Sequence, residues 1–168
     1  MKVLVTAATR HGSTADIAAA IARVLQTQCI DAEETHPEDV HDLSAYDAVV
    51  IGSAVYAGRW LEPAAAMVSR CARQLTERPV WMFSSGPIGH PATPAEGPHV
   101  KAIELATGAL EHRVFPGKLD KEGLGRLERT IVRAVRAPQG DFRDWEQIHE
   151  WAMEIADALS SAHASRSG

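Results

Sequence analysis

The stretch VLVTAATRHGSTADIAAAIARVL, residues 3–25, changes from one structural pattern to another within a few residues. Val3–Val5 form a β-branched-rich run without charge, which is typical of a strand buried on both faces of a parallel sheet. From Ser13 onward apolar residues recur at helical spacing, and Ser13 or Thr14 is suited to cap the first turn. The stretch therefore predicts a strand, a short loop and a helix in immediate succession.

The loop between them, TRHGST at residues 9–14, is rich in hydroxyl groups and contains one glycine. A strand-to-helix turn presents unpaired backbone N–H groups at the positive end of the helix dipole, where anions bind. The hydroxyls of Thr9, Ser13 and Thr14 can donate further hydrogen bonds. Two interpretations stay open here: the loop holds a phosphate, or its hydroxyls serve only the helix.

The composition is that of an ordinary globular protein with a single domain. The 168 residues are 45% hydrophobic and 23% charged, which is enough for a sizeable core. We expect one domain over residues 1–160 and a loose C-terminal tail over 161–168. Because the chain has no apolar stretch of about 18 residues and no signal-like N-terminus, we expect a cytoplasmic protein.

Charge and metal-binding residue types argue against two classes of function. The net charge of −5 gives no basis for nucleic-acid binding. Cys29 and Cys71 lack the spacing of metal ligands, and the eight histidines form no carboxylate-backed pair on a helical face. We therefore expect two idle thiols and no metal site.

Strand and helix patterns alternate along the rest of the chain. Four further strands are predicted, at residues 29–37, 48–51, 80–83 and 111–117, the first of them a charged edge strand. Three further helices are predicted, at about residues 62–76, 100–110 and 145–159. This alternation predicts a three-layer α/β fold in which helices cover both faces of a five-stranded parallel sheet.

Three loops follow the carboxyl ends of the first, third and fourth predicted strands. They read TRHGST, SAVYAGRW (residues 53–60) and SSGPIG (residues 84–89). In an open doubly wound sheet this edge binds ligands, beside the switch in strand order. A phosphate cradle, an aromatic side chain and a glycine-rich wall together fit a phosphate joined to a flat heterocycle.

Other folds that share these features require residues that this chain lacks. A P-loop would need G-x-x-x-x-G-K-[ST], and a dinucleotide-binding domain would need G-x-G-x-x-G after the first strand. A receiver-type signalling domain would carry acidic residues after the first strand and an aspartate after the third. The chain has Thr-Ala-Ala and Gly52-Ser53 at those two places.

The first loop, GSAVYAGRW at residues 52–60 and GDFRDWEQI at residues 140–148 together resemble the flavodoxin-like family. They are most similar to the flavodoxin-domain branch that includes menaquinone-dependent protoporphyrinogen oxidase. The family pattern Ser/Thr-x-Thr-Gly-x-Thr is altered here, since Arg10 and His11 precede the glycine. The resemblance implies a flavodoxin-like three-layer sandwich with strand order 2-1-3-4-5 and FMN bound without a covalent link.

The resemblance also implies which residues bind FMN. They are Thr9, Arg10, His11, Gly12, Ser13, Thr14, Ala54, Val55, Tyr56, Ala57, Gly58, Ser84, Ser85, Gly86, Pro87, Ile88 and Gly89. Arg10 either adds a charge to the phosphate site or is a solvated surface residue. Tyr56 either stacks on the isoalloxazine ring or packs under its loop, and we expect the competing aromatic, Trp60, to belong to the core or its rim.

The segment LGRLERTIVRAVRAPQG, residues 124–140, reverses the charge of an otherwise acidic protein. Its four arginines fall on one predicted helical face: Arg126, Arg129, Arg133 and Arg136. Three interpretations are open: a solvated helix face, a contact for an acidic partner or carboxylate-bearing substrate, and a peripheral contact with the inner face of a membrane.

The resemblance implies an FMN-dependent oxidoreductase similar to the quinone-linked oxidase branch. Its partners would be a redox protein, a quinone or a small-molecule substrate, and not nucleic acid. The alternative is a flavodoxin that carries electrons between protein partners. A third hypothesis is a domain that has lost the flavin and serves as an interaction module.

Overall fold

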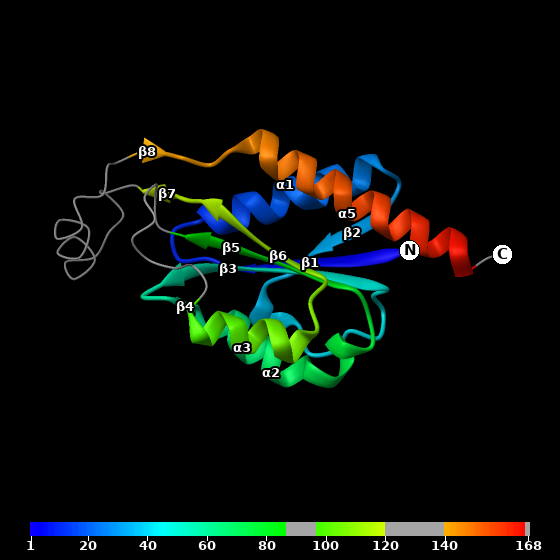
Figure 1. Ribbon diagram of the computed structural model, residues 1–168, viewed down its shortest axis with the longest axis horizontal. Coiled ribbons are helices and arrows are strands. Elements are labelled where there is room, and N and C mark those ends of the chain that lie inside the picture. Colours follow the sequence, from blue (N-terminus) through cyan, green and yellow to red (C-terminus); the bar gives the residue numbers. More distant parts are fainter. Residues whose placement is uncertain (87–96, 120–139, 167–168) are drawn as a thin grey trace.

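Within the described residues, five parallel strands form a central sheet with helices on both sides (Figure 1). The structure is a computed structural model that describes residues 1–86, 97–119 and 140–166. The parallel strands are β1 (Lys2–Ala8), β2 (Asp31–Glu34), β3 (Ala48–Tyr56), β5 (Val80–Gly86) and β6 (Glu111–Pro116). Their order, β2-β1-β3-β5-β6, confirms the predicted order, because β4 is only a short addition to the end of β3.

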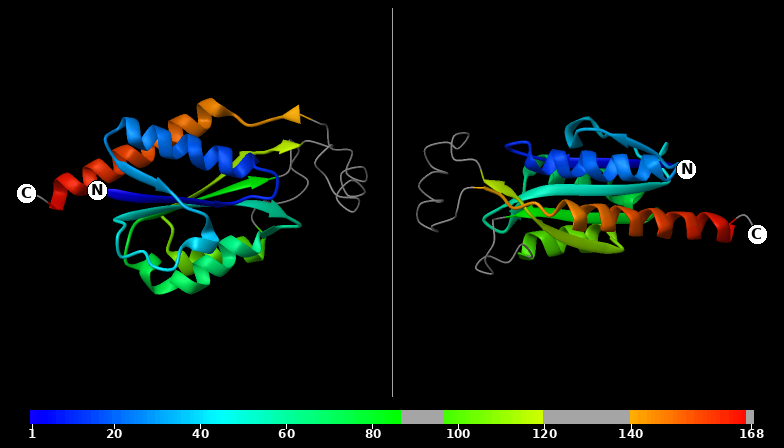
Figure 2. Two further views of the ribbon diagram at one scale, coloured as in Figure 1. Left: turned by 180° about the vertical axis from the view of Figure 1, so that it is seen from behind. Right: turned by 90° about the horizontal axis from the view of Figure 1, so that it is seen from above.

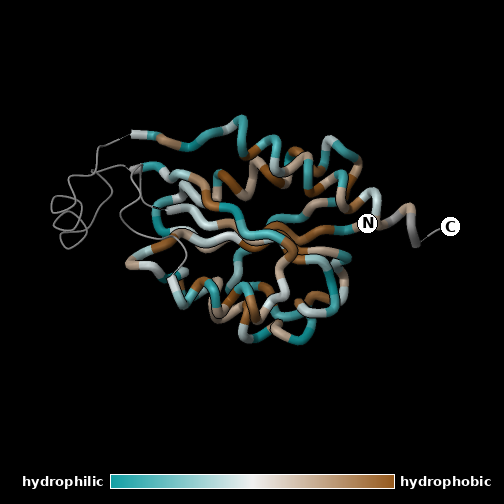
Figure 3. The backbone as a smooth tube through the Cα atoms, viewed as in Figure 1, coloured by the Kyte–Doolittle hydropathy of each residue, from teal (hydrophilic) through white to brown (hydrophobic). Residues whose placement is uncertain are grey.

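The helices are distributed over both faces of the sheet (Figure 2). Helices α1 (Ser13–Thr27) and α5 (Trp145–Arg166) cover one face. Helices α2 (Glu62–Thr76) and α3 (Pro98–Thr107) cover the other. The helices alternate between hydrophobic and hydrophilic residues along their length (Figure 3), as is typical of helices that bury one side against a sheet.

Three short elements complete the described fold. The 3₁₀ helix η1 (Pro37–Asp39) follows β2. Strand β4 (Arg59–Trp60) turns back on the end of β3 in an antiparallel hairpin. Strands β7 (Lys118–Leu119) and β8 (Gly140–Asp141) form a separate antiparallel pair that begins just after β6. The pair joins two parts of the chain that lie far apart in sequence.

Two helices end at other residues than the sequence predicts. Helix α3 ends at Thr107 because Gly108 adopts the left-handed conformation that terminates helices, at φ 62°. Helix α5 continues to Arg166, so the prediction of a loose tail is wrong for residues 161–166. Its sequence there, SAHASR, contains neither glycine nor proline, so nothing stops the helix after its last core residue, Leu159.

The core on the α1 and α5 face is built around three buried aromatic rings. The rings of Phe83, Phe115 and Trp151 have centroids 5.5 to 6.2 Å apart. Phe83 also crosses the neighbouring strand at Gly52, where an added Cβ would lie 2.1 Å from the Phe83 Cζ atom. Glycine at position 52 is therefore required by the packing of Phe83, and not by its own backbone conformation.

Gly52→Ala should destabilise the protein by about 1–3 kcal/mol, because the added methyl overpacks the core. Urea denaturation followed by circular dichroism measures the loss. In the double variant Gly52→Ala/Phe83→Leu, the leucine leaves room for the added methyl. The double variant should therefore lose less stability than the two single variants lose together. Additive losses would contradict this packing account.

Candidate cofactor site

The register of the sheet brings the ends of three strands together. Ala8 pairs with Ser53, and Ser53 pairs with Ser84, so β1, β3 and β5 end at the same edge of the sheet. Strand β1 lies between β2 and β3, and its helix packs on the opposite face from the helix that follows β3. The two connections diverge at this point, which makes the edge a switch point where ligands bind in such folds.

The first loop leads into α1 through a glycine and leaves the helix without a side-chain cap. Gly12 occupies the N-cap position with φ 83°, and the Asp16 N–H donates to its carbonyl at 3.0 Å. No side-chain hydrogen bond caps this end among the described residues, so the prediction that Ser13 or Thr14 caps the helix is wrong. The N–H groups of the first turn are therefore available to an anion.

The hydroxyl of Ser13 has a partner that sequence analysis missed. Its Oγ accepts a hydrogen bond from the Lys118 N–H at 3.1 Å, while Thr14 beside it is buried. A hydroxyl that accepts one bond keeps its own proton for another acceptor. Ser13 can thus still donate to a bound anion while β7 holds its oxygen in place.

The second loop is a tight hairpin. Ala57, at φ 49°, and Gly58, at φ 72°, are the two central residues between β3 and β4, and both have the positive φ of a type I′ turn. Tyr56 stands at the end of β3, half-buried, with the guanidinium of Arg10 over its ring at 5.4 Å from the centroid. Arg10 therefore joins the first loop to the second.

Trp60 is a core residue, as expected. It is 4% exposed, and its indole Nε1 donates to the Oγ of Ser84 at 2.8 Å. The same Oγ lies 2.8 Å from Nε2 of His112 on the next strand. The Ser84 hydroxyl is thereby engaged on both sides within the protein.

Several predicted site residues lie within strands and not in loops. Ala54 and Val55 are buried in β3, and Ser84 and Ser85 are buried in β5. The strand continues to Gly86, whose carbonyl accepts the Gly117 N–H at 3.2 Å. The remaining three predicted residues of this loop, Pro87, Ile88 and Gly89, lie outside the described residues.

Polar contacts and a close backbone approach hold the hairpin between β3 and β4. The Oγ of Ser53 accepts the Leu61 N–H at 3.0 Å and donates to the carbonyl of Ala54 at 2.9 Å. Gly97, which precedes α3, packs so closely that an added Cβ would lie 2.4 Å from the carbonyl oxygen of Gly58. These contacts hold the hairpin in one place relative to the sheet.

His99 supports the same hairpin in its neutral form. Its Nδ1 accepts the Trp60 N–H at 3.3 Å, which requires that this nitrogen carry no proton. Burial, together with the positive charge of Arg59, lowers the pKa of His99 below its ordinary value of 6.5.

The lowered pKa predicts a pH dependence of stability. As the pH falls below about 6.5, the unfolded chain takes up this proton before the folded chain does, so the folded state loses stability. We expect the free energy of unfolding, measured in urea between about pH 7.5 and pH 5.5, to fall more steeply in the native sequence than in His99→Gln. The glutamine keeps an acceptor oxygen without the titration, and equal slopes would contradict this account.

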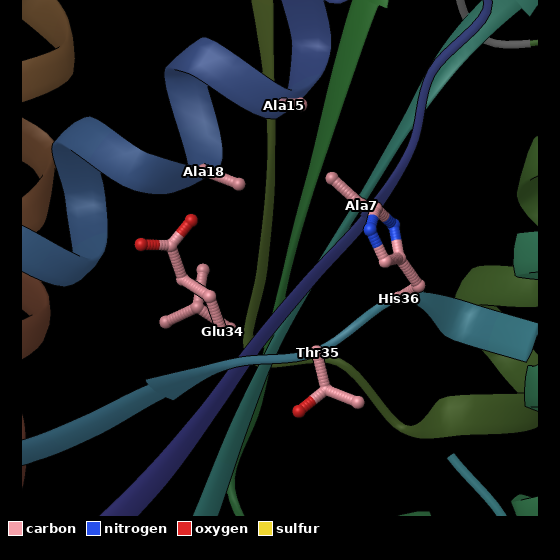
Figure 4. Close-up of a pocket in the computed structure, with 7 residues that line it drawn as sticks. Ala7, Ala15, Ala18, Glu34, Thr35 and His36 are labelled. Atoms are coloured by element: carbon pink, nitrogen blue, oxygen red, sulfur yellow. The ribbon is translucent and has the colours of Figure 1, made fainter. Parts of the chain in front are cut away.

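A small pocket lies apart from the three loops (Figure 4). It holds about 120 Å³ between β1, the end of β2 and α1, with the Glu34 carboxylate near Ala18, the His36 ring near Ala7, and Thr35 pointing away. Ligand pockets commonly hold about 300–1,000 Å³. No residue of the three loops lines this pocket, and no cluster of metal-binding side chains occurs among the described residues.

Comparison with known proteins identifies the family. A model of the flavodoxin domain matches residues 4–146, and the chain belongs to this family. The protoporphyrinogen IX dehydrogenase [quinone] of Escherichia coli K12 is 24% identical in an alignment that covers 93% of this chain and 95% of that protein. The predicted resemblance to the flavodoxin-like family is confirmed.

Solved structures confirm the fold. A flavodoxin from the domain Archaea superposes with a TM-score of 0.65 at 15% identity and covers 95% of this chain and 99% of its own. Flavodoxin 1 of Bacillus cereus also gives a TM-score of 0.65, at 17% identity and with 94% and 98% covered. FMN is the cofactor of the flavodoxin family, and the uncapped, glycine-led start of α1 fits its phosphate.

Proposed function

We propose that this protein is an FMN-dependent oxidoreductase that delivers electrons to a quinone. The observation that carries the proposal is the open N-terminus of α1 at the switch point between β1 and β3 in a flavodoxin domain. The similarity to a quinone-linked dehydrogenase along almost the whole chain supports the acceptor. Protoporphyrinogen IX, which the name of that relative gives, is the electron donor to test first.

The proposed phosphate site uses the backbone of the first loop. The N–H groups of residues 10–14 and the hydroxyls of Thr9, Ser13 and Thr14 would bind the phosphate. Gly12 allows the loop to turn into the helix at positive φ. Arg10 adds a positive charge above Tyr56, between this loop and the next.

The proposed ring site uses the second and third loops. Tyr56 and the peptide groups of Ala57 and Gly58 follow β3, and β5, the next strand of the sheet, ends beside them. When bound, FMN supplies reversible uptake of electrons and protons. The chain's own contribution is to orient the cofactor and to limit the access of water, which the fixed hairpin favours.

A membrane contact would bring the protein to a quinone. None of the described helices combines the length and apolar character needed to cross a bilayer. The proposed contact is the basic segment with Arg126, Arg129, Arg133 and Arg136, which lies outside the described residues. Its support comes from sequence alone: a basic amphipathic pattern in a chain of net charge −5.

Titration with FMN, followed by quenching of flavin fluorescence, tests the cofactor site. Saturable quenching is expected, and Gly12→Val should abolish it, because valine cannot adopt φ 83° and the loop must rearrange. Gly108→Val is the matched control: this glycine also has positive φ and open space around it, but it ends α3, away from the three loops. Equal FMN binding by Gly12→Val and the control would contradict the proposed phosphate site.

Reoxidation of the reduced holoprotein tests the acceptor. After anaerobic reduction, mixing with a water-soluble naphthoquinone should restore the flavin absorption rapidly. A carrier flavodoxin, which the solved structural relatives make the second candidate, should react slowly with a small quinone and rapidly with a protein partner. Slow reaction with the quinone would therefore favour the carrier over the enzyme.

A further inference from the structure

Asp16 puts a negative charge in the first turn of α1, beside the proposed phosphate site. A carboxylate here stabilises the helix, but it weakens the positive potential that attracts an anion. The side chain is exposed, and its Oδ2 accepts a hydrogen bond from Nη1 of Arg143 at 2.7 Å. Arg143 lies 127 residues further along the chain.

Arg143 is held in a fixed position by other contacts. Its side chain is only 7% exposed. Its Nε and Nη2 bond to the two carboxylate oxygens of Asp141 at 2.8 and 2.6 Å, and its guanidinium lies over the Trp145 ring at 4.5 Å from the centroid. The bonds from Arg143 lower the pKa of Asp141, so this partner stays ionised at neutral pH.

A second contact from the same region reaches the same turn. Lys118 of β7 donates its N–H to Ser13, and β7 pairs with β8, which ends at Asp141. Ser13 and Asp16 are three residues apart and lie on the same side of α1. The β7–β8 pair and Arg143 therefore contact the helix at both a hydroxyl and a carboxylate of its first turn.

We propose that Arg143 is a positioning residue for the phosphate site, which neutralises Asp16 and holds the first turn of α1 in place for a phosphate dianion. The inference rests on the proposed FMN function and names a residue outside the three loops. Among the described residues, Arg143 pairs with the carboxylates of Asp16 and Asp141, the charge of Lys118 acts on Asp141, and Arg10 adds a positive charge in the first loop. Loss of Arg143 removes the ion pairs of Asp16 and Asp141, and the Asp16 carboxylate in the first turn of α1 would then oppose a bound anion.

If Arg143 had a merely structural role, its loss would weaken the binding of all flavins alike. FMN and riboflavin share the ring and differ in the phosphate, so the ratio of their dissociation constants reports the phosphate site alone. Arg143→Gln should raise the dissociation constant of FMN about tenfold, the size of one lost charge-assisted interaction. The dissociation constant of riboflavin should change by no more than about twofold. The loss should shrink at high salt, because salt screens the exposed carboxylates.

Removal of the carboxylate gives the complementary test. Asp16→Asn should bind FMN at least as tightly as the native sequence. The double variant Arg143→Gln/Asp16→Asn should recover most of the FMN affinity that Arg143→Gln loses. Arg113→Gln is the matched control, because Arg113 also pairs with two carboxylates, Glu111 and Glu154, and lies over a tryptophan ring. Arg113 belongs to β6 and pairs with Glu154 of α5, away from the first loop, so Arg113→Gln should not change the ratio of the FMN and riboflavin dissociation constants.

The outcomes separate this inference from the proposed function. Equal weakening of both flavins by Arg143→Gln, or an unchanged FMN affinity, would overturn the role of Arg143 while FMN binding by the native protein stands. If Arg143→Gln fails to fold, weaker FMN binding by Asp16→Asn would overturn it. If the native protein binds neither flavin, the proposed function and this inference fall together.

Discussion

The parallel pairing of β1 with β3 at the centre of the sheet is the constraint on which the rest of the structure depends. This pairing sets Ala8 beside Ser53. The helices that follow the two strands lie on opposite faces because they lead to β2 and β5, on opposite sides of this pair. The backbone groups at the start of α1 are consequently left uncovered by the neighbouring connection. The site is therefore a result of the strand order, and in our proposal the residues of the first loop bind the phosphate there.

Positive and negative charges both act on the first loop, although the chain as a whole carries a net charge of −5. The helix dipole and Arg10 contribute positive potential to the first loop, and Asp16 opposes them. Arg143 and Lys118, which come from distant segments, contact the same turn. Lys118 and Arg143 thus link the described residues on both sides of the basic segment to the candidate cofactor site.

Local patterns predicted the three-layer α/β class with five parallel strands, and the strand order came from the resemblance to the flavodoxin-like family. The strand-loop-helix at residues 3–25 and the bounds of α2 follow from hydrophobic periodicity within each element. The predicted end of α5 at residue 159 is wrong, because core residues stop after Leu159 while the helix continues to Arg166. Apolar periodicity reports burial against a core, and a helix can extend beyond it.

The candidate site was predictable only where the loops themselves carry it. The hairpin at Ala57 and Gly58 lies within the predicted second loop, but the bond from Lys118 to Ser13 and the pairing of Arg143 with Asp16 join residues more than 100 positions apart. No periodicity or motif encodes such contacts. The motif GDFRDW, residues 140–145, resembles the flavodoxin-like family, and in the structure its arginine, Arg143, pairs with Asp16.

The most direct test of the central claim is an NMR titration of the isotope-labelled protein with FMN, which follows every backbone amide. The account predicts that the largest shifts occur at residues 10–14, with a second group at residues 56–58. Shifts centred on the small pocket at residues 34–36, or no shifts at the start of α1, would contradict it.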